Sequence, residues 1–124
     1  MKAQKEIETI QINGVEYVRK DSVSSLAQPL DGMDFCIVRC RDAGVFAGYV
    51  KEHDGGEVVL VNSIRLHAWY GASLSQLSQE GTPDTSKCRF AMTEAIKTVE
   101  GAIEVTPCTE KARINLQSVN QWRC

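Results

Sequence analysis

Apolar and polar residues alternate along the first half of the chain in the two-residue period typical of β-strands. Residues 34–41 carry apolar side chains on both alternating sets, which predicts a central strand covered on both faces. Residues 45–52 and 57–62 continue the pattern. The segments between these three strands contain Gly44 and the Asp-Gly-Gly run at 54–56, which are turn signals. We therefore predict an antiparallel three-stranded meander.

Gly48 interrupts the second of these strands. A glycine inside a strand commonly marks a bulge or a close approach of another backbone. We expect one of these features at position 48.

The second half of the chain has shorter elements. The spacing of Leu74 and Leu77 predicts a short helix over 71–81. A second helix is predicted over 109–118, opened by either Thr106-Pro107 or Thr109, since Thr is an acceptable N-cap and Pro suits a first helical turn. Further strands are predicted over 88–92 and 102–106. Residues 93–101 fit a helical turn or a strand equally well, and the pattern does not decide between them.

The N-terminal part has a different character. Residues 7–19 alternate around Asn13-Gly14, a pair that favours a tight hairpin turn, and residues 20–33 are polar. The sequence thus predicts an N-terminal β-hairpin and linker over 1–33 and a compact α+β domain over 34–124. In that domain we expect an antiparallel sheet of about five strands with two short helices.

Composition narrows the class of protein. The chain has 124 residues, 43% of them hydrophobic and 24% charged, as expected of one globular domain. It lacks a run of about 20 apolar residues, so we expect no membrane span. The charged start also lacks the apolar core of a signal peptide, which favours the cytoplasm. A net charge of −2 makes nucleic acid an unlikely partner.

The five cysteines favour reduced, packed thiols. Cys36 and Cys40 share a predicted strand and would lie about 13 Å apart, too far for a disulfide. Neither a Cys-x-x-Cys pair nor a His at metal-ligand spacing is present, so we expect no metal and no cofactor. We also find no combination of nucleophile, base and orienting residue, and we expect no enzymatic activity.

One segment, residues 65–75, combines groups that suit a nucleotide-like ligand. Arg65 supplies donors for phosphate, Trp69 and Tyr70 supply stacking faces, and Ser73 lies at the start of the predicted helix. The alternative is that Trp69 and Tyr70 are core or interface residues and that Arg65 forms an ion pair.

Arg39 and Arg41 flank the end of the first strand of the meander. They extend the candidate ligand site if they face the same pocket. The alternatives are an acidic partner or a solvated strand end.

Several longer runs resemble a family of short tailed-phage proteins of unassigned function. The resemblance covers about residues 34–122, and the N-terminal INGVEYVRKDSV is similar to a hairpin often fused in front of phage accessory domains. The runs that carry it are IVRCRDAGVFAGYV, NSIRLHAWYGASLSQLSQEG, AIEVTPCTEKA and VNQW. The resemblance implies a phage origin and a place in the host cytoplasm, and it brings no assigned activity.

Phage accessory proteins of this size often counter host immunity, which suggests two functions by analogy. The first is a non-enzymatic sponge that sequesters a nucleotide-derived immune signal. Since a small domain gains a deep pocket most easily between subunits, this function predicts a symmetric homo-oligomer. The alternative is an inhibitor or adaptor that binds a host defence protein directly.

Overall fold

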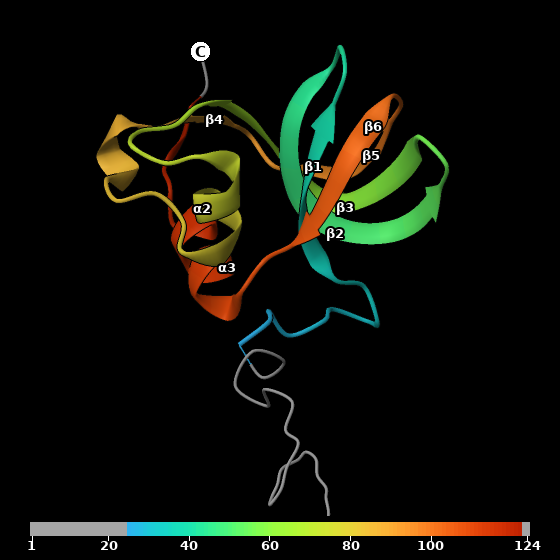
Figure 1. Cartoon of the computed structure of the whole chain (residues 1–124), viewed down its shortest axis with the longest axis horizontal. Helices are drawn as coiled ribbons and strands as arrows, with labels where there is room; N and C mark the ends of the chain where they lie inside the picture. The colour runs from blue at the N-terminus through green and yellow to red at the C-terminus, as the bar shows by residue number, and fades with distance from the viewer. Residues whose placement is uncertain (1–24, 123–124) are drawn as a thin grey trace, which may run out of the picture.

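A computed structural model of the protein describes residues 25–122 (Figure 1). The predicted hairpin at 7–19 lies outside these residues, as does most of the predicted unit 1–33. The elements are β1 (Phe35–Cys40), β2 (Gly44–Asp54), β3 (Glu57–Ala68), α2 (Leu74–Gln79), the 3₁₀-helix η1 (Thr85–Lys87), β4 (Arg89–Ala91), β5 (Glu94–Val99), β6 (Ala102–Pro107), α3 (Glu110–Gln117) and β7 (Gln121–Trp122).

The meander of β1, β2 and β3 is confirmed, with antiparallel pairing throughout. Gly44 and Gly55 adopt positive φ in its two turns, a conformation that glycine reaches without steric cost. Gly48 lies at a register shift between β2 and β3, so the expected irregularity is present. β3 is longer than predicted, because it continues through 63–68.

The extra length of β3 lets two different strands pair along it. β5 pairs with its first half, from Val58 to Ser63, and β4 pairs near its end, at Leu66 and Ala68. The sheet order is β6-β1-β2-β3-β4-β7 with β5 beside β3. Residues 94–99 are therefore a strand, which decides between the two alternatives left open for 93–101.

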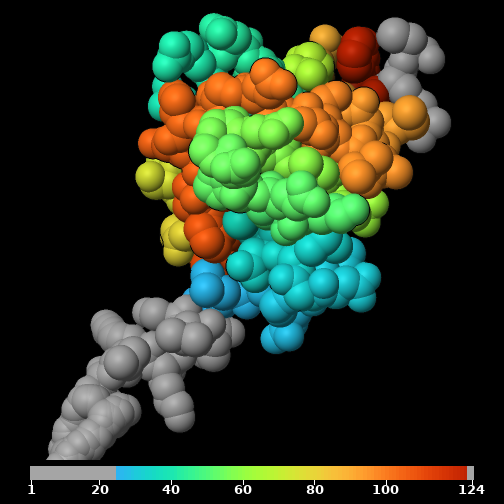
Figure 2. Space-filling model, turned by 90° about the vertical axis from the view of Figure 1, so that its right-hand side faces the viewer, coloured from blue at the N-terminus to red at the C-terminus, as the bar shows by residue number. Residues whose placement is uncertain are grey.

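β5 and β6 are consecutive in the chain, yet one pairs with β3 and the other with β1. The sheet must curl to allow this, and β6, β1, β2, β3 and β5 form a partly closed barrel (Figure 1). The turn between β5 and β6 is held by hydrogen bonds from Ala102 N–H to Gly56 O (3.0 Å) and from Arg41 N–H to Gly101 O (2.8 Å). Figure 2 shows β5 and β6 in orange around the green β2–β3 hairpin.

Two hydrophobic cores lie on the two sides of β1, β2 and β3, as the apolar pattern of residues 34–41 predicted. The barrel core lies inside the curled sheet, and the helical core lies between the sheet and the helices. The buried members of the barrel core are Val38, Cys40, Phe46, Val58, Leu60 and Val99. Those of the helical core include Phe35, Ile37, Tyr49, Ile64, Leu66, Leu77, Phe90, Cys108, Ala112 and Leu116.

Both predicted helices are present. Of the two predicted starts, Thr109 is the N-cap of α3, and its hydroxyl accepts from Ala112 N–H (3.1 Å) and donates to Gln79 O (2.6 Å). The same side chain thus caps one helix and ties it to the end of the other. In the part of the chain that the structure describes, no helix is long and apolar enough to cross a membrane.

The fold mixes helices with a mostly antiparallel sheet, which is compatible with the predicted α+β class. The expected count of about five strands was too low, because the sheet has seven strands within residues 25–122. The sequence missed β7, since its two residues are too few for a periodic pattern. It left β5 undecided, since four of the six residues of β5 are exposed and their alternation is weak.

Candidate functional site

Arg65 lies in β3 and faces the barrel side of the sheet. Its Nη1 donates to the carbonyl oxygen of Ala43 (2.6 Å), and its guanidinium lies 4.6 Å above the centre of the Phe46 ring. Phe46 is fully buried in the barrel core. The side chain therefore ties β3 to the turn between β1 and β2.

Trp69 lies on the opposite side, where it packs against the helical core. Its Nε1 donates to the carbonyl oxygen of Ala72 (2.8 Å). The Ser73 hydroxyl is also engaged, because it accepts from Gln76 N–H (3.1 Å) as the N-cap of α2. Tyr70 is exposed, and the Lys87 ammonium lies 4.3 Å above its ring.

The structure therefore does not join Arg65 to Trp69, Tyr70 and Ser73 in one site. The physical reason is the length of β3. Because residue 65 lies inside a strand, its side chain points to one face of the sheet, while the chain beyond residue 68 turns over the other face.

The two remaining predicted residues are also separated. Arg39 lies opposite Glu104 in the β1–β6 pair, and its Nη1 is 3.9 Å from the Glu104 carboxylate. Arg41 is exposed in the turn after β1, and its backbone N–H contacts the β5–β6 turn. Of the six predicted residues, Arg39 alone lines the groove described next.

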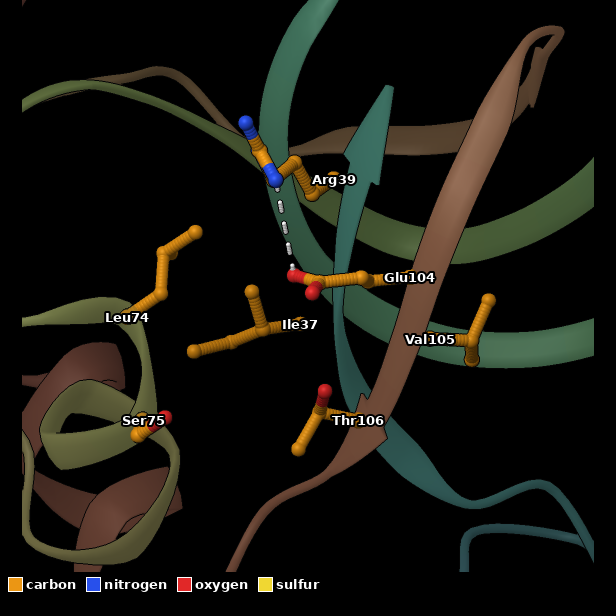
Figure 3. A pocket seen from close by; sticks show the side chains of 7 residues that line it. All are labelled: Ile37, Arg39, Leu74, Ser75, Glu104, Val105 and Thr106. Atoms are coloured by element: carbon orange, nitrogen blue, oxygen red, sulfur yellow. Dashed lines mark ion pairs between the residues drawn. The ribbon is translucent and has the colours of Figure 1, made fainter. Parts of the chain in front are cut away.

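An open groove of about 250 Å³ lies between the β1–β6 pair and the start of α2. Figure 3 shows Ile37 between Leu74 of α2 and the β6 side chains, with Arg39 and Glu104 above it, and Val105 turned away. The groove is lined by Ile37, Arg39, Leu74, Ser75, Glu104, Val105 and Thr106.

The groove has an apolar floor and a polar rim, since Ile37 is almost fully buried and the Arg39 and Glu104 side chains are half exposed. Its volume is below the range of about 300–1,000 Å³ typical of small-molecule sites. An ion pair this exposed contributes little to stability, so both charges are free to form new contacts. The groove suits one apolar side chain of a partner, flanked by charge.

The buried cysteines have weakly acidic thiols. Burial raises the pKa of Cys36 to about 11 and that of Cys108 to about 12. Burial also raises the pKa of Cys40, although Arg65 acts in the opposite direction. These thiols are protonated at neutral pH and make poor nucleophiles. Within residues 25–122, no group of three His, Cys, Asp or Glu side chains is placed to hold a metal ion.

The structure also brings together exposed residues that the sequence analysis did not group into one site. His67, Tyr70, Lys87, Arg89 and Trp122 are all exposed, and we call them the aromatic–cation surface. The Arg89 guanidinium lies 4.9 Å above the Trp122 ring, and His67 meets that ring edge-on at 6.4 Å. These residues come from three separate parts of the chain, so no local spacing could have revealed them.

Comparison with known proteins identifies the family of the chain but assigns no activity to it. Residues 33–116 match the family described as a domain of unknown function, DUF6948. The matched range agrees closely with the 34–122 over which the sequence resembled a family of unassigned function. No curated protein and no solved structure is significantly similar to the chain. Since the match spans most of the folded domain, the chain belongs to the DUF6948 family.

Proposed function

We propose that the chain is a phage-encoded, non-enzymatic binding protein that acts in the host cytoplasm by docking on a host defence protein. The phage origin rests on the resemblance of residues 34–122 to tailed-phage proteins. The mode of action rests on one observation, which is that the groove beside α2 adjoins an edge strand, β6.

The backbone of β6 is arranged to accept a further strand. The hydrogen bond from Cys108 N–H to Phe35 O (2.9 Å) sets the phase of the β1–β6 ladder. Since residues alternate along an antiparallel pair, Val105 directs its own N–H and C=O to the outer edge. No described strand pairs with that edge. An extended segment of a partner can therefore add to the sheet at Val105.

Two features make this edge selective. Pro107 lacks an N–H, so strand addition is limited to the part of β6 before it. The groove then receives an apolar side chain over Ile37, while Arg39 and Glu104 contact polar groups of the partner. This arrangement has the apolar anchor and polar rim of protein-binding hot spots.

A groove-filling variant tests the docking. We expect the tagged protein to retain one stoichiometric host protein from lysate of defence-proficient cells, and Ser75→Trp to abolish its retention. Glu57→Trp is the matched control, because it adds the same side chain at the exposed first residue of β3. Absence of a stoichiometric partner, or equal retention by Ser75→Trp, would contradict the proposal.

Sequestration of a nucleotide-derived immune signal by a symmetric homo-oligomer is the second candidate. The observation that favours it is the exposed Tyr70 ring beneath the Lys87 ammonium, which pairs a stacking face with a cation. Native mass spectrometry of protein purified from phage-infected, defence-proficient cells tests it. An oligomer with a nucleotide-sized adduct supports sequestration, and a ligand-free species argues for the host-protein partner.

A further inference from the structure

The aromatic–cation surface holds two similar pairs of side chains. Tyr70 and Trp122 are each 46% exposed, and each ring carries a cation over one face, Lys87 and Arg89 respectively. Singly exposed apolar side chains are common on protein surfaces, but here each exposed ring is paired with a cation. Two such rings with two cations indicate a ligand-binding surface.

The fold holds this surface in place. Ala68 of β3 pairs with Arg89, and Ala91 of β4 pairs with Trp122. The Gln121 side chain anchors β7, because it accepts from Thr93 N–H (3.0 Å) and donates to Thr93 Oγ1 (2.5 Å). The Trp122 ring is thus positioned by pairing on its strand and by the neighbouring glutamine.

The two pairs are adjacent. Lys87 ends η1 and Arg89 begins β4, so the two residues are two positions apart and their Cα atoms are at most about 7 Å from each other. In Figure 1 the segments that carry them, η1, β4 and β7, lie on the helical side of the molecule, at the opposite end from the β2–β3 turn. The surface is therefore distinct from the barrel.

The Arg89 charge favours an anion beside the Trp122 ring, whereas Lys87 beside Tyr70 already faces a carboxylate. Arg89 forms no ion pair with a described carboxylate, while the Lys87 ammonium lies 4.0 Å from Asp84. A guanidinium stacked on an aromatic ring keeps its N–H groups free for phosphate. An aromatic ring accepts a nucleobase by stacking, whatever the base.

We propose that the aromatic–cation surface binds a dinucleotide unit, with one base on Trp122, the other on Tyr70, and phosphate oxygens at Arg89 and Lys87. This inference rests on the second candidate function, since it names the site and the ligand class for nucleotide binding. A free dinucleotide and a single-stranded nucleic acid both present this unit.

Titration of the ¹⁵N-labelled full chain at low salt tests the site. The probes are the diribonucleotide pApA, a ten-residue oligoriboadenylate and inorganic phosphate. We expect pApA to shift the indole N–H signal of Trp122 and to leave that of Trp69 in place, because Trp69 Nε1 is bonded to Ala72 on the helical core.

Variants then assign the contacts. Trp122→Ala and Arg89→Gln should each weaken binding of pApA at least fivefold, as expected for loss of a stacked base or a charged contact. Lys51→Gln is the control, since it removes a positive charge from an exposed position on β2. Arg89→Gln also covers the case in which Trp122→Ala disturbs β7.

The outcomes distinguish failure of this binding site from failure of nucleotide binding as a function. Binding that neither variant weakens overturns this site and leaves nucleotide binding intact, whereas no binding of pApA or the oligomer overturns both. Equal binding of inorganic phosphate overturns the stacking. If the oligoriboadenylate binds more tightly than pApA and its binding depends on salt, the site is supported and the ligand is a single-stranded nucleic acid. If pApA and the oligoriboadenylate bind with equal affinity, the site is supported and the ligand is a free dinucleotide.

Discussion

Gly48 lies so close to Ser63 that a β-carbon at position 48 would be 3.0 Å from Ser63 Cα and 3.3 Å from the carbonyl oxygen of Val61. The contact lies at the register shift where β2 crosses β3. Both neighbours include backbone atoms, which cannot move without disturbing the ladder. The glycine therefore lets the two central strands of the sheet approach.

Replacement of this glycine should destabilise the fold. We expect Gly48→Ala to lower the free energy of unfolding by about 1–3 kcal/mol, as for overpacking of a core. Gly56→Ala is the control, because an added β-carbon there meets its nearest neighbour at an ordinary 3.7 Å. Urea denaturation of both variants measures the difference, and equal losses would contradict the close approach.

The Ser63 hydroxyl is buried and has no hydrogen-bond partner among the described residues. Such a group costs free energy in the folded state. Ser63→Ala should therefore raise the free energy of unfolding by about 1 kcal/mol. Ser78→Ala is the matched control, because that buried hydroxyl donates to Ser75 O (2.8 Å), and its removal should lower stability. Thermal denaturation distinguishes the two signs.

The contacts of Arg65 predict a role in stability. Arg65→Ala removes the charged hydrogen bond to Ala43 and the contact with Phe46, and it should cost about 1.5–3 kcal/mol. Arg41→Ala removes an exposed side chain and should change stability by less than about 0.5 kcal/mol. Chemical denaturation compares them. If Arg65→Ala is as stable as the wild type and no longer binds pApA, Arg65 would instead be a ligand-binding residue.

The buried thiols should resist alkylation. Burial holds the pKa of Cys36 at about 11 and that of Cys108 at about 12, so little thiolate forms at pH 8. We expect iodoacetamide to modify the partly exposed Cys88 in the native protein and to reach Cys36 and Cys108 only in urea. Peptide mass mapping reads each site. Modification of Cys108 at the rate of Cys88 in the native state would contradict this burial.

Acid should weaken the N-terminal turn of α3. Hydrogen bonding by Arg113, followed by Gln28 N–H, holds the pKa of Glu110 below its ordinary value of 4.5. The stabilisation is therefore complete above pH 4.5 and disappears as the pH falls through the lower, folded-state pKa. Between pH 6 and pH 3, Glu110→Gln and Arg113→Gln should each lose less stability than the wild type. Parallel pH slopes for all three proteins would contradict the pairing.

The local elements could be predicted because their signals are local. The meander of β1, β2 and β3 followed from alternation and glycine turns, and α3 followed from its Thr109 cap. The two-sided burial of β1 followed from the apolar residues on both of its faces. In each case, neighbours in the chain determine the conformation.

The candidate ligand site illustrates the opposite case. Arg65, Trp69, Tyr70 and Ser73 lie within nine positions of each other, but β3 directs Arg65 to the barrel side while Trp69 packs on the helical core. Proximity in sequence did not give proximity in space, because β3 ends at Ala68 after a register shift, and the chain beyond it turns over the helical core.

The sequence by itself determined the periodic strands and the position of the C-terminal helix, since each depends on neighbouring residues. Only the tertiary structure decided the curl that separates β5 from β6, the groove beside Ile37, and the meeting of Arg89 with Trp122. These depend on pairings between residues far apart in the chain, and hydrophobic periodicity carries no information about which distant strands will pair.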